Sequence, residues 1–133
     1  MGELRIGQVS SIDYANGMIK VLYSDRDGTV SKFLPYLSLN DEYKMPDIGQ
    51  YVLVAHLSNG SEAGIVLGGY WNKNHKSAVS GKGVYRKELS NTKNMAYIQY
   101  DDESRSLVIK ADNIQFLSEK GNITLEQIID KMN

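Results

Sequence analysis

The first 70 residues alternate between short apolar runs and turn-forming residues, and this pattern limits the chain to a β-rich fold. Apolar residues recur with the two-residue period of a strand in five stretches, 4–13, 18–24, 29–34, 51–57 and 63–67. Five short antiparallel strands hide their edges best in a closed barrel. We therefore expect an all-β chain whose N-terminal part, residues 1–72, is a five-stranded barrel of the OB type.

Turn signals separate these strands. Asn16-Gly17 favours the tight turn of a hairpin, and Asp25–Gly28 and Ser58–Ser61 predict two further turns. A change of phase beside Gly7 predicts a bend or bulge in the first strand, as small barrels need. Pro35 should end the third strand or mark its edge.

The third stretch is expected to be one continuous strand. Its alternation places Val30, Lys32 and Leu34 on one face and Phe33 on the other.

In the fifth stretch and just after it, Gly64, Gly68 and Gly69 are interpreted as bends of the barrel. No Gly-Lys-Ser/Thr follows them, so a phosphate-binding loop is not indicated.

A change of composition separates the second part of the chain from the first. Residues 73–83 are polar and contain glycine, which predicts a linker. Short strands are expected at 84–89, 95–100, 106–110 and 114–118, with Asp101–Ser104 as a turn between two of them. Asp112-Asn113 shifts the alternation, so we expect the chain to bend there.

The last residues change to the period of a helix. Leu125, Ile128, Ile129 and Met132 share one helical face, and Thr124 with Gln127 has the spacing of a capping box. The sequence therefore predicts a helix at 124–132. About nine residues are too few for a helix to hold by itself, so its apolar face must pack on something.

Residues 84–133 hold too few apolar residues for a core of their own, and isolated hairpins are marginal in water. Copies of the same segment around a symmetry axis would supply the missing partners. We expect a trimerising segment whose packing residues are Leu107, Ile109, Ile114, Phe116, Leu125, Ile128, Ile129 and Met132.

Several stretches of the first part resemble a known family. These are Gly7-Gln8-Val9, Val21–Gly28, Ser31–Pro35 and Pro46–Val54, and the most specific is Gly64-Ile65-Val66-Leu67-Gly68-Gly69-Tyr70-Trp71. In this order and spacing they are similar to the OB domain of the baseplate assembly protein V family, the central spikes of contractile phage tails. The same domain also occurs in type VI secretion spikes.

The resemblance implies a structural protein of the virion baseplate or of a phage-tail-like particle such as a bacteriocin. It implies a homotrimer of intertwined β-structure that attaches to the tail hub and helps to penetrate the target cell envelope mechanically. A separate protein could cap its tip. We expect hub or subunit contacts at Tyr70, Trp71, Phe33 and Tyr36.

The sequence also departs from the family. Its second part is too short for the long β-helical needle of members that pierce an outer membrane. His56 and His75 lie far apart and do not form the His-x-His iron site of some members. We therefore expect no metal, no cofactor and no catalytic residue.

The candidate chemical groups have simpler interpretations. Asp25–Gly28 lacks the further oxygen ligands of a calcium loop, and Asp101-Asp102-Glu103 is interpreted as a solvated turn. His56 ends an apolar strand, where packing is the usual role. His75, in the linker, is expected to be solvated.

Composition and charge argue against several other kinds of site and function. The absence of cysteine rules out disulfides, thiolate metal sites and a cysteine nucleophile, and a net charge of −1 argues against nucleic-acid binding and against docking on an anionic membrane. The N-terminus shows no signal-peptide pattern, so assembly in the bacterial cytoplasm is expected.

Two alternatives remain open. One is a monomeric OB-fold module that binds single-stranded nucleic acid or oligosaccharide through exposed aromatic residues. The other is a cell-wall-degrading enzyme of the same tail, for which the sequence offers no good carboxylate pair.

Overall fold

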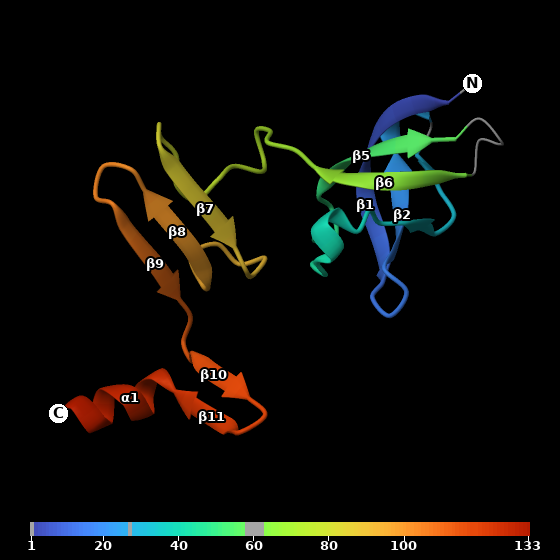
Figure 1. Ribbon diagram of the computed structural model, residues 1–133. Coiled ribbons are helices and arrows are strands. Elements are labelled where there is room, and N and C mark those ends of the chain that lie inside the picture. Colours follow the sequence, from blue (N-terminus) through green and yellow to red (C-terminus); the bar gives the residue numbers. More distant parts are fainter. Residues whose placement is uncertain (1, 27, 58–62) are drawn as a thin grey trace. The chain divides into compact units, whose positions relative to one another are not determined.

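The structure is a computed structural model that describes residues 2–26, 28–57 and 63–133, with only the backbone of Arg26. The chain is mostly β and ends in one α-helix (Figure 1). It divides into two compact units, Met1–Lys76 and Ser77–Asn133, and the division lies inside the predicted linker. No helix among the described residues is long and apolar enough to cross a membrane.

The first unit is built on one six-stranded sheet. Neighbouring strands follow the order β3-β2-β1-β5-β6, and β4 also pairs with β2. The strands are β1 (Glu3–Asp13), β2 (Met18–Tyr23), β3 (Thr29–Val30), β4 (Leu34–Pro35), β5 (Tyr51–His56) and β6 (Gly64–Gly69). Two short 3-10 helices, η1 (Ser24–Arg26) and η2 (Leu39–Asp41), lie in the connections.

Strand β1 is the shared centre of this sheet. It pairs with β5 from Glu3 to Gln8 and with β2 from Gln8 to Asp13. The expected irregularity is present, but it lies between Val9 and Ser11 in the pairing with β2. Gly7 serves close packing instead, because a Cβ there would lie 2.3 Å from Val21 Cγ1.

The expected alternation of β2 is confirmed, because Ile19, Val21 and Tyr23 are buried. They form the core of the first unit with Val9, Leu34, Met45, Val52, Val54 and Val66.

The hairpin turn before β2 is also confirmed, with Gly17 in the left-handed region at φ 63°. The predicted turn Ser58–Ser61 lies outside the described residues, as does Asp27 of the turn Asp25–Gly28.

The prediction of one continuous third strand is wrong. The stretch forms β3 and β4 with a break between them, so Val30 is exposed although Leu34 is buried. The cause is Ser31. The Ser31 N–H donates to the Val21 carbonyl (2.8 Å), as in a strand ladder. The Val21 N–H, however, donates to the Ser31 hydroxyl (2.9 Å) and not to a backbone carbonyl. The side chain thereby interrupts the ladder.

The segment after β4 also reaches β6. Tyr36 forms an isolated parallel bridge with Val66, and the Leu37 N–H donates to the Val66 carbonyl (2.9 Å). No continuous strand pairing closes the sheet at this point.

The second unit consists of a three-stranded sheet, a hairpin and a helix. The sheet has the order β7-β8-β9, with β7 (Val84–Glu88), β8 (Tyr97–Asp101) and β9 (Ser106–Lys110). The hairpin pairs β10 (Gln115–Ser118) with β11 (Gly121–Thr124), a strand that the sequence did not predict. The expected bend at Asp112-Asn113 is a full break, because β9 and β10 belong to different sheets.

Helix α1 (Leu125–Met132) begins as predicted. The Gln127 N–H donates to Thr124 Oγ1 (3.1 Å), and the Thr124 N–H donates to Gln127 Oε1 (2.9 Å), which completes the capping box. The Leu125 N–H donates to the Ile114 carbonyl (2.8 Å) and ties the helix start to the segment before β10.

Candidate interaction surfaces and a polar pocket

The β7-β8-β9 sheet has two chemically different faces. Residues paired across strands point to the same side of a sheet, and neighbours along a strand point to opposite sides. The register pairs Tyr85 with Tyr100 and Tyr100 with Leu107, and it pairs Ile98 with Ile109. These residues form the apolar face of the sheet: Tyr85, Ile98, Tyr100, Leu107 and Ile109, with Lys87 beside Ile98.

The opposite face, the polar face, is organised around Arg86. Its guanidinium donates to Glu88 (Nε to Oε2, 2.6 Å), Gln99 Oε1 (2.6 Å) and Asn94 Oδ1 (2.7 Å). It also stacks over the Tyr97 ring, with Cζ 3.4 Å from the centroid. The partners of Arg86 therefore come from β7, from β8 and from the connection between these two strands.

The apolar face has no such cover. Leu107 is 64% exposed, Tyr85 59% and Ile109 56%. All residues from 77 to 133 are described, and none of them is buried. The second unit therefore has an amphipathic sheet without a core behind it.

The hairpin and the helix expose further predicted packing residues. Phe116 on β10 is exposed, and its neighbour Leu117, which the sequence did not single out, is 81% exposed. On α1, Leu125, Ile129 and Met132 are exposed, whereas Ile114 before β10 and Ile128 on the helix are half-buried. The structure therefore places Leu107 and Ile109 on one sheet face, and the other six predicted residues on the hairpin, on the helix or just before them.

The four predicted contact residues of the first unit differ in their surroundings. Trp71 is 68% exposed and stacks on His75, with ring centroids 5.0 Å apart and planes at 21°. Phe33 is exposed beneath Lys20 Nζ, and Tyr70 is half-buried. Tyr36 packs against the core, and burial raises its pKa above the ordinary value of 10.0.

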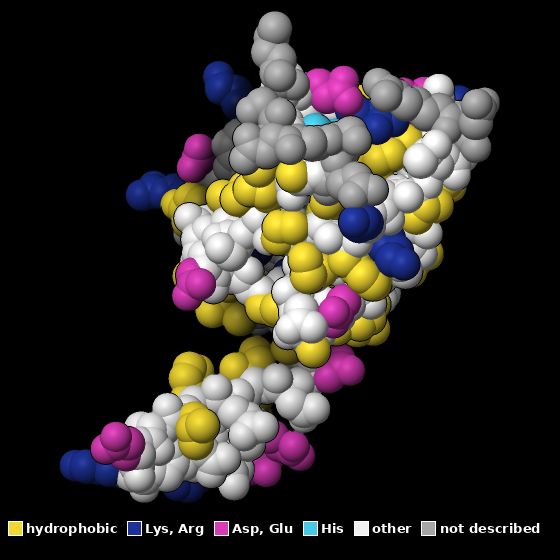
Figure 2. Space-filling view, turned by 90° about the vertical axis from the view of Figure 1, so that its right-hand side faces the viewer, with side chains coloured by type: hydrophobic (Ala, Val, Ile, Leu, Met, Phe, Trp, Pro, Cys, Tyr) yellow, Lys and Arg dark blue, Asp and Glu magenta, His cyan; other side chains and the backbone are white. Residues whose placement is uncertain are grey.

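The first unit also carries apolar side chains on its surface. Leu4 and Ile6 on β1 are exposed on the face where Leu53 of β5 pairs with Ile6. The face seen in Figure 2 shows hydrophobic side chains in several patches between Lys, Arg, Asp and Glu side chains.

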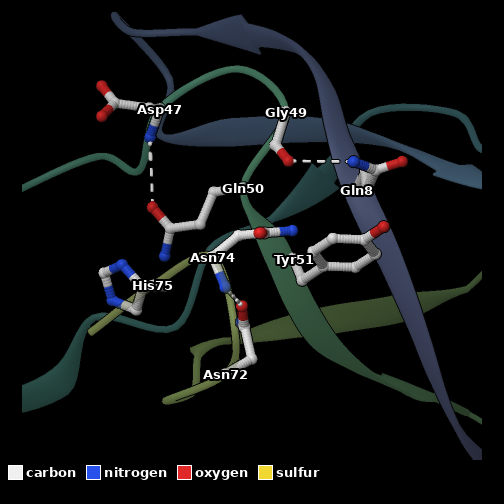
Figure 3. A pocket seen from close by; sticks show the side chains of 8 residues that line it. All are labelled: Gln8, Asp47, Gly49, Gln50, Tyr51, Asn72, Asn74 and His75. Carbon is white, nitrogen blue, oxygen red and sulfur yellow. Dashed lines mark hydrogen bonds between the residues drawn. The ribbon is translucent and has the colours of Figure 1, made fainter.

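A polar pocket of about 290 Å³ opens at one edge of the first unit. Figure 3 shows its lining, which comes from β1, from the turn before β5, from the start of β5 and from the turn after β6: Gln8, Asp47, Gly49, Gln50, Tyr51, Asn72, Asn74 and His75. His75, which was expected to be solvated, is half-buried: it lines the pocket and stacks on Trp71.

His56 is buried, as expected for a packing role. Its Nε2 shares a hydrogen bond of 2.7 Å with the Tyr23 hydroxyl, and Arg5 stacks over the Tyr23 ring with Cζ 3.6 Å from the centroid. Burial raises the pKa of Tyr23, and the positive charge of Arg5 opposes that shift. The phenol is therefore neutral near pH 7.

The acidic turn of the second unit has a local structural role. Asp101 Oδ1 accepts from the Glu103 N–H (2.9 Å), and the Asp102 N–H donates to the Gly83 carbonyl (3.0 Å). Among the described residues, no group of three His, Cys, Asp or Glu side chains is placed to hold a metal ion.

Sequence reasoning missed Tyr85 and Tyr100 on the apolar face and the carboxamides of the pocket. The alternation of side chains along the strands on either side of residues 89–96 could have placed the two tyrosines on one face. The pocket had no local signal, because its side chains come from segments up to 67 residues apart, from Gln8 to His75.

The sequence matches no protein-family model and no curated protein.

Proposed function

We propose that the protein is a structural, trimeric spike of a contractile tail baseplate and not an enzyme. In this account the first unit is an OB-type barrel that attaches to the tail hub. The second unit forms the intertwined β-structure that aids penetration of the target cell envelope when the tail contracts. The proposal rests on the resemblance of the first part to the baseplate spike family, and on the apolar face of the second part, which needs a cover.

The uncovered apolar face of the β7-β8-β9 sheet carries the proposal. Water disfavours an apolar surface of this kind, and burial gains roughly 25 cal/mol for each Å² removed from it. Because residues 77–133 supply no core to cover it, the cover must come from elsewhere. Three copies that turn this face toward a common axis would bury it, and the polar face around Arg86 would face water.

The exposed hairpin and helix support the same arrangement. Leu117 is 81% exposed, Met132 79% and Phe116 59%. Around a threefold axis one surface of each copy packs on a different surface of the next, and residues at the axis itself meet their own copies, so each copy supplies the partner that another lacks. Separation of the copies would then break many contacts at once, which suits a part that transmits force.

The strand connections support an OB-type barrel. Strand β1 pairs with both β2 and β5, β4 pairs with β2, and β6 pairs with β5. The parallel bridge from Tyr36 to Val66 links the two remaining edges. Extension of that bridge into a short parallel pairing would complete a five-stranded closed barrel, with β3 as an addition beside β2.

Exposed aromatic side chains support a contact with the hub. Trp71 lies just after β6, at the end of the stretch with the most specific resemblance, and is held by the His75 ring. Aromatic residues are enriched in protein interfaces. A protein that caps the tip remains a further proposed partner.

Deletion of the chain from the cells that make it tests the function. We expect that particles without the chain fail to assemble a working baseplate and fail to kill. A Val108→Ser chain should restore killing and an Ile109→Ser chain should not, because these neighbours on β9 point to the polar and apolar faces. Particles that assemble and kill normally without the chain would contradict the proposal.

A monomeric binding module is the alternative, and the polar pocket favours it. It requires that the apolar face stay exposed in solution. A full-length chain that remains monomeric would favour this alternative over the spike.

A further inference from the structure

We propose that the polar pocket of the first unit binds a neutral saccharide, with one sugar ring inside it and further units outside. This inference is independent of the spike function, because the pocket lies wholly within the first unit.

The frame of the pocket is fixed by backbone hydrogen bonds. The Val9 N–H donates to the Gln50 carbonyl (2.9 Å), and the Gly49 N–H donates to the Val9 carbonyl (2.8 Å). On the other side, Asn72 and His75 exchange two backbone hydrogen bonds of 3.0 and 3.1 Å. The lining groups therefore stand on a rigid edge, which lowers the entropic cost of binding.

Carboxamides dominate the lining. Gln8 comes from β1, Gln50 from the segment before β5, and Asn72 and Asn74 from the turn after β6, and Figure 3 shows Gln8, Gln50 and Asn74 around the same space. Gln8 Nε2 donates to the Gly49 carbonyl (3.1 Å), and its Oε1 accepts no hydrogen bond from a described residue. The Asn74 side chain and Gln50 Nε2 make no hydrogen bond to a described residue.

This donor and acceptor set fits hydroxyl groups. A carboxamide offers two donors and an acceptor side by side, and a sugar hydroxyl both donates and accepts. No Lys or Arg is among the described residues that line the pocket, so it lacks the cations that bind phosphate or nucleic acid. Asp47 supplies one carboxylate, a further acceptor for hydroxyl groups.

Aromatic rings complete the site. Tyr51 lines the pocket. Trp71 is not one of the lining residues, but its exposed ring stacks on His75, which is, so it lies where a sugar unit outside the pocket would meet it. One face of a sugar ring carries C–H groups and packs on such rings. The volume of about 290 Å³ is near the lower limit of ligand pockets, roughly 300 Å³, and therefore suits one ring.

Gly69 shows how closely the site is packed behind Gln50. A Cβ at residue 69 would lie 2.2 Å from Gln50 Nε2. Only the absence of a side chain there lets Gln50 hold its place in the pocket.

Trp71 is the single tryptophan of the chain and stacks on His75 of the lining, so its fluorescence reports on the ring next to the pocket. The full-length protein is titrated separately with triacetylchitotriose, maltotriose and cellotriose. We expect a saturable change with at least one of them, with a Kd of about 1 mM or below. Asn74→Ala should weaken binding at least tenfold at an unchanged thermal midpoint, whereas Asn113→Ala, an exposed carboxamide of the second unit, should bind normally.

Three outcomes would overturn the inference. The first is the absence of a saturable change with all three trisaccharides up to about 20 mM, well above a Kd of 1 mM. The second is equal affinity of the Asn74→Ala and unchanged chains. The third is a saturable change with inorganic phosphate alone that Asn74→Ala removes, which would make the pocket an anion site. Because the solution mass of the chain does not enter this test, its failure is distinct from a failure of the spike function.

Discussion

The buried hydrogen bond between Tyr23 and His56 should contribute measurably to the stability of the first unit. Tyr23 is 2% exposed and His56 6% exposed, and their hydrogen bond of 2.7 Å is the one side-chain bond that His56 makes among the described residues. His56 Nδ1 is buried without a partner. Tyr23→Phe keeps the ring that Arg5 stacks on but removes the hydroxyl, so the imidazole loses its remaining bond.

The expected cost follows from the asymmetry of buried hydrogen bonds. A buried polar group that loses its partner costs about 1–3 kcal/mol, whereas removal of both partners costs much less. Tyr23→Phe should therefore lower the free energy of unfolding by about 1–3 kcal/mol. His56→Leu should cost a similar amount, because it leaves the phenol unpaired. The double variant should cost clearly less than the sum, with a coupling of at least about 0.5 kcal/mol.

Urea unfolding at pH 7 measures these values, with Trp71 fluorescence as the signal from the first unit. All chains are compared at one protein concentration, because self-association would shift apparent stability. A Tyr23→Phe chain within about 0.5 kcal/mol of the unchanged chain would refute the reasoning, since that is the ordinary range of surface substitutions. Additive costs in the double variant would refute it equally.

Three further predictions concern packing, capping and pH. Gly7→Ala should cost about 1–3 kcal/mol in urea unfolding, because its Cβ would lie 2.3 Å from Val21 Cγ1 and 2.8 Å from the Leu22 carbonyl oxygen. Thr124→Ala should lower the helical circular dichroism signal and cost about 1 kcal/mol, because it removes the cap of α1. Burial raises the folded-state pKa of Tyr36, so the unfolded chain ionises first; the contribution of Tyr36 to stability should be constant below about pH 10 and fall above it. Tyr36→Phe should make that alkaline fall shallower in a pH series.

Local signals predicted the elements whose determinants lie close together in the chain. The strand β2 follows from a two-residue apolar period, and its buried residues are the expected ones. Helix α1 follows from the spacing of Thr124 and Gln127, which needs no tertiary contact. The turn at Gly17 follows from the same kind of local chemistry.

Long-range partners decided what the sequence could not predict. The third strand divides because the Ser31 hydroxyl accepts a hydrogen bond from the Val21 N–H, ten residues away. The alternation of apolar residues along the sequence does not reveal such a bond. The surroundings of His75 depend on its stack with Trp71 and on the pocket that it lines with residues distant in the sequence. Strand β11 lacks a strong apolar period and is recognised only by its pairing with β10.

The candidate surfaces were predicted in part. Leu107 and Ile109 were expected to need partners, and both lie on the uncovered apolar face. Tyr85 and Tyr100 joined them only through the register of β7 and β8, which depends on how the chain turns at 89–96. A single sequence does not fix that register by period alone.

The solution mass of the full chain, measured by light scattering on a sizing column, tests the central claim most directly. One chain has a mass of 14.9 kDa, so the account predicts a trimer of about 45 kDa. A chain that ends at Lys76, the boundary of the first unit, should be monomeric because it lacks the apolar face. A full-length chain that elutes as a 14.9 kDa monomer would contradict the account.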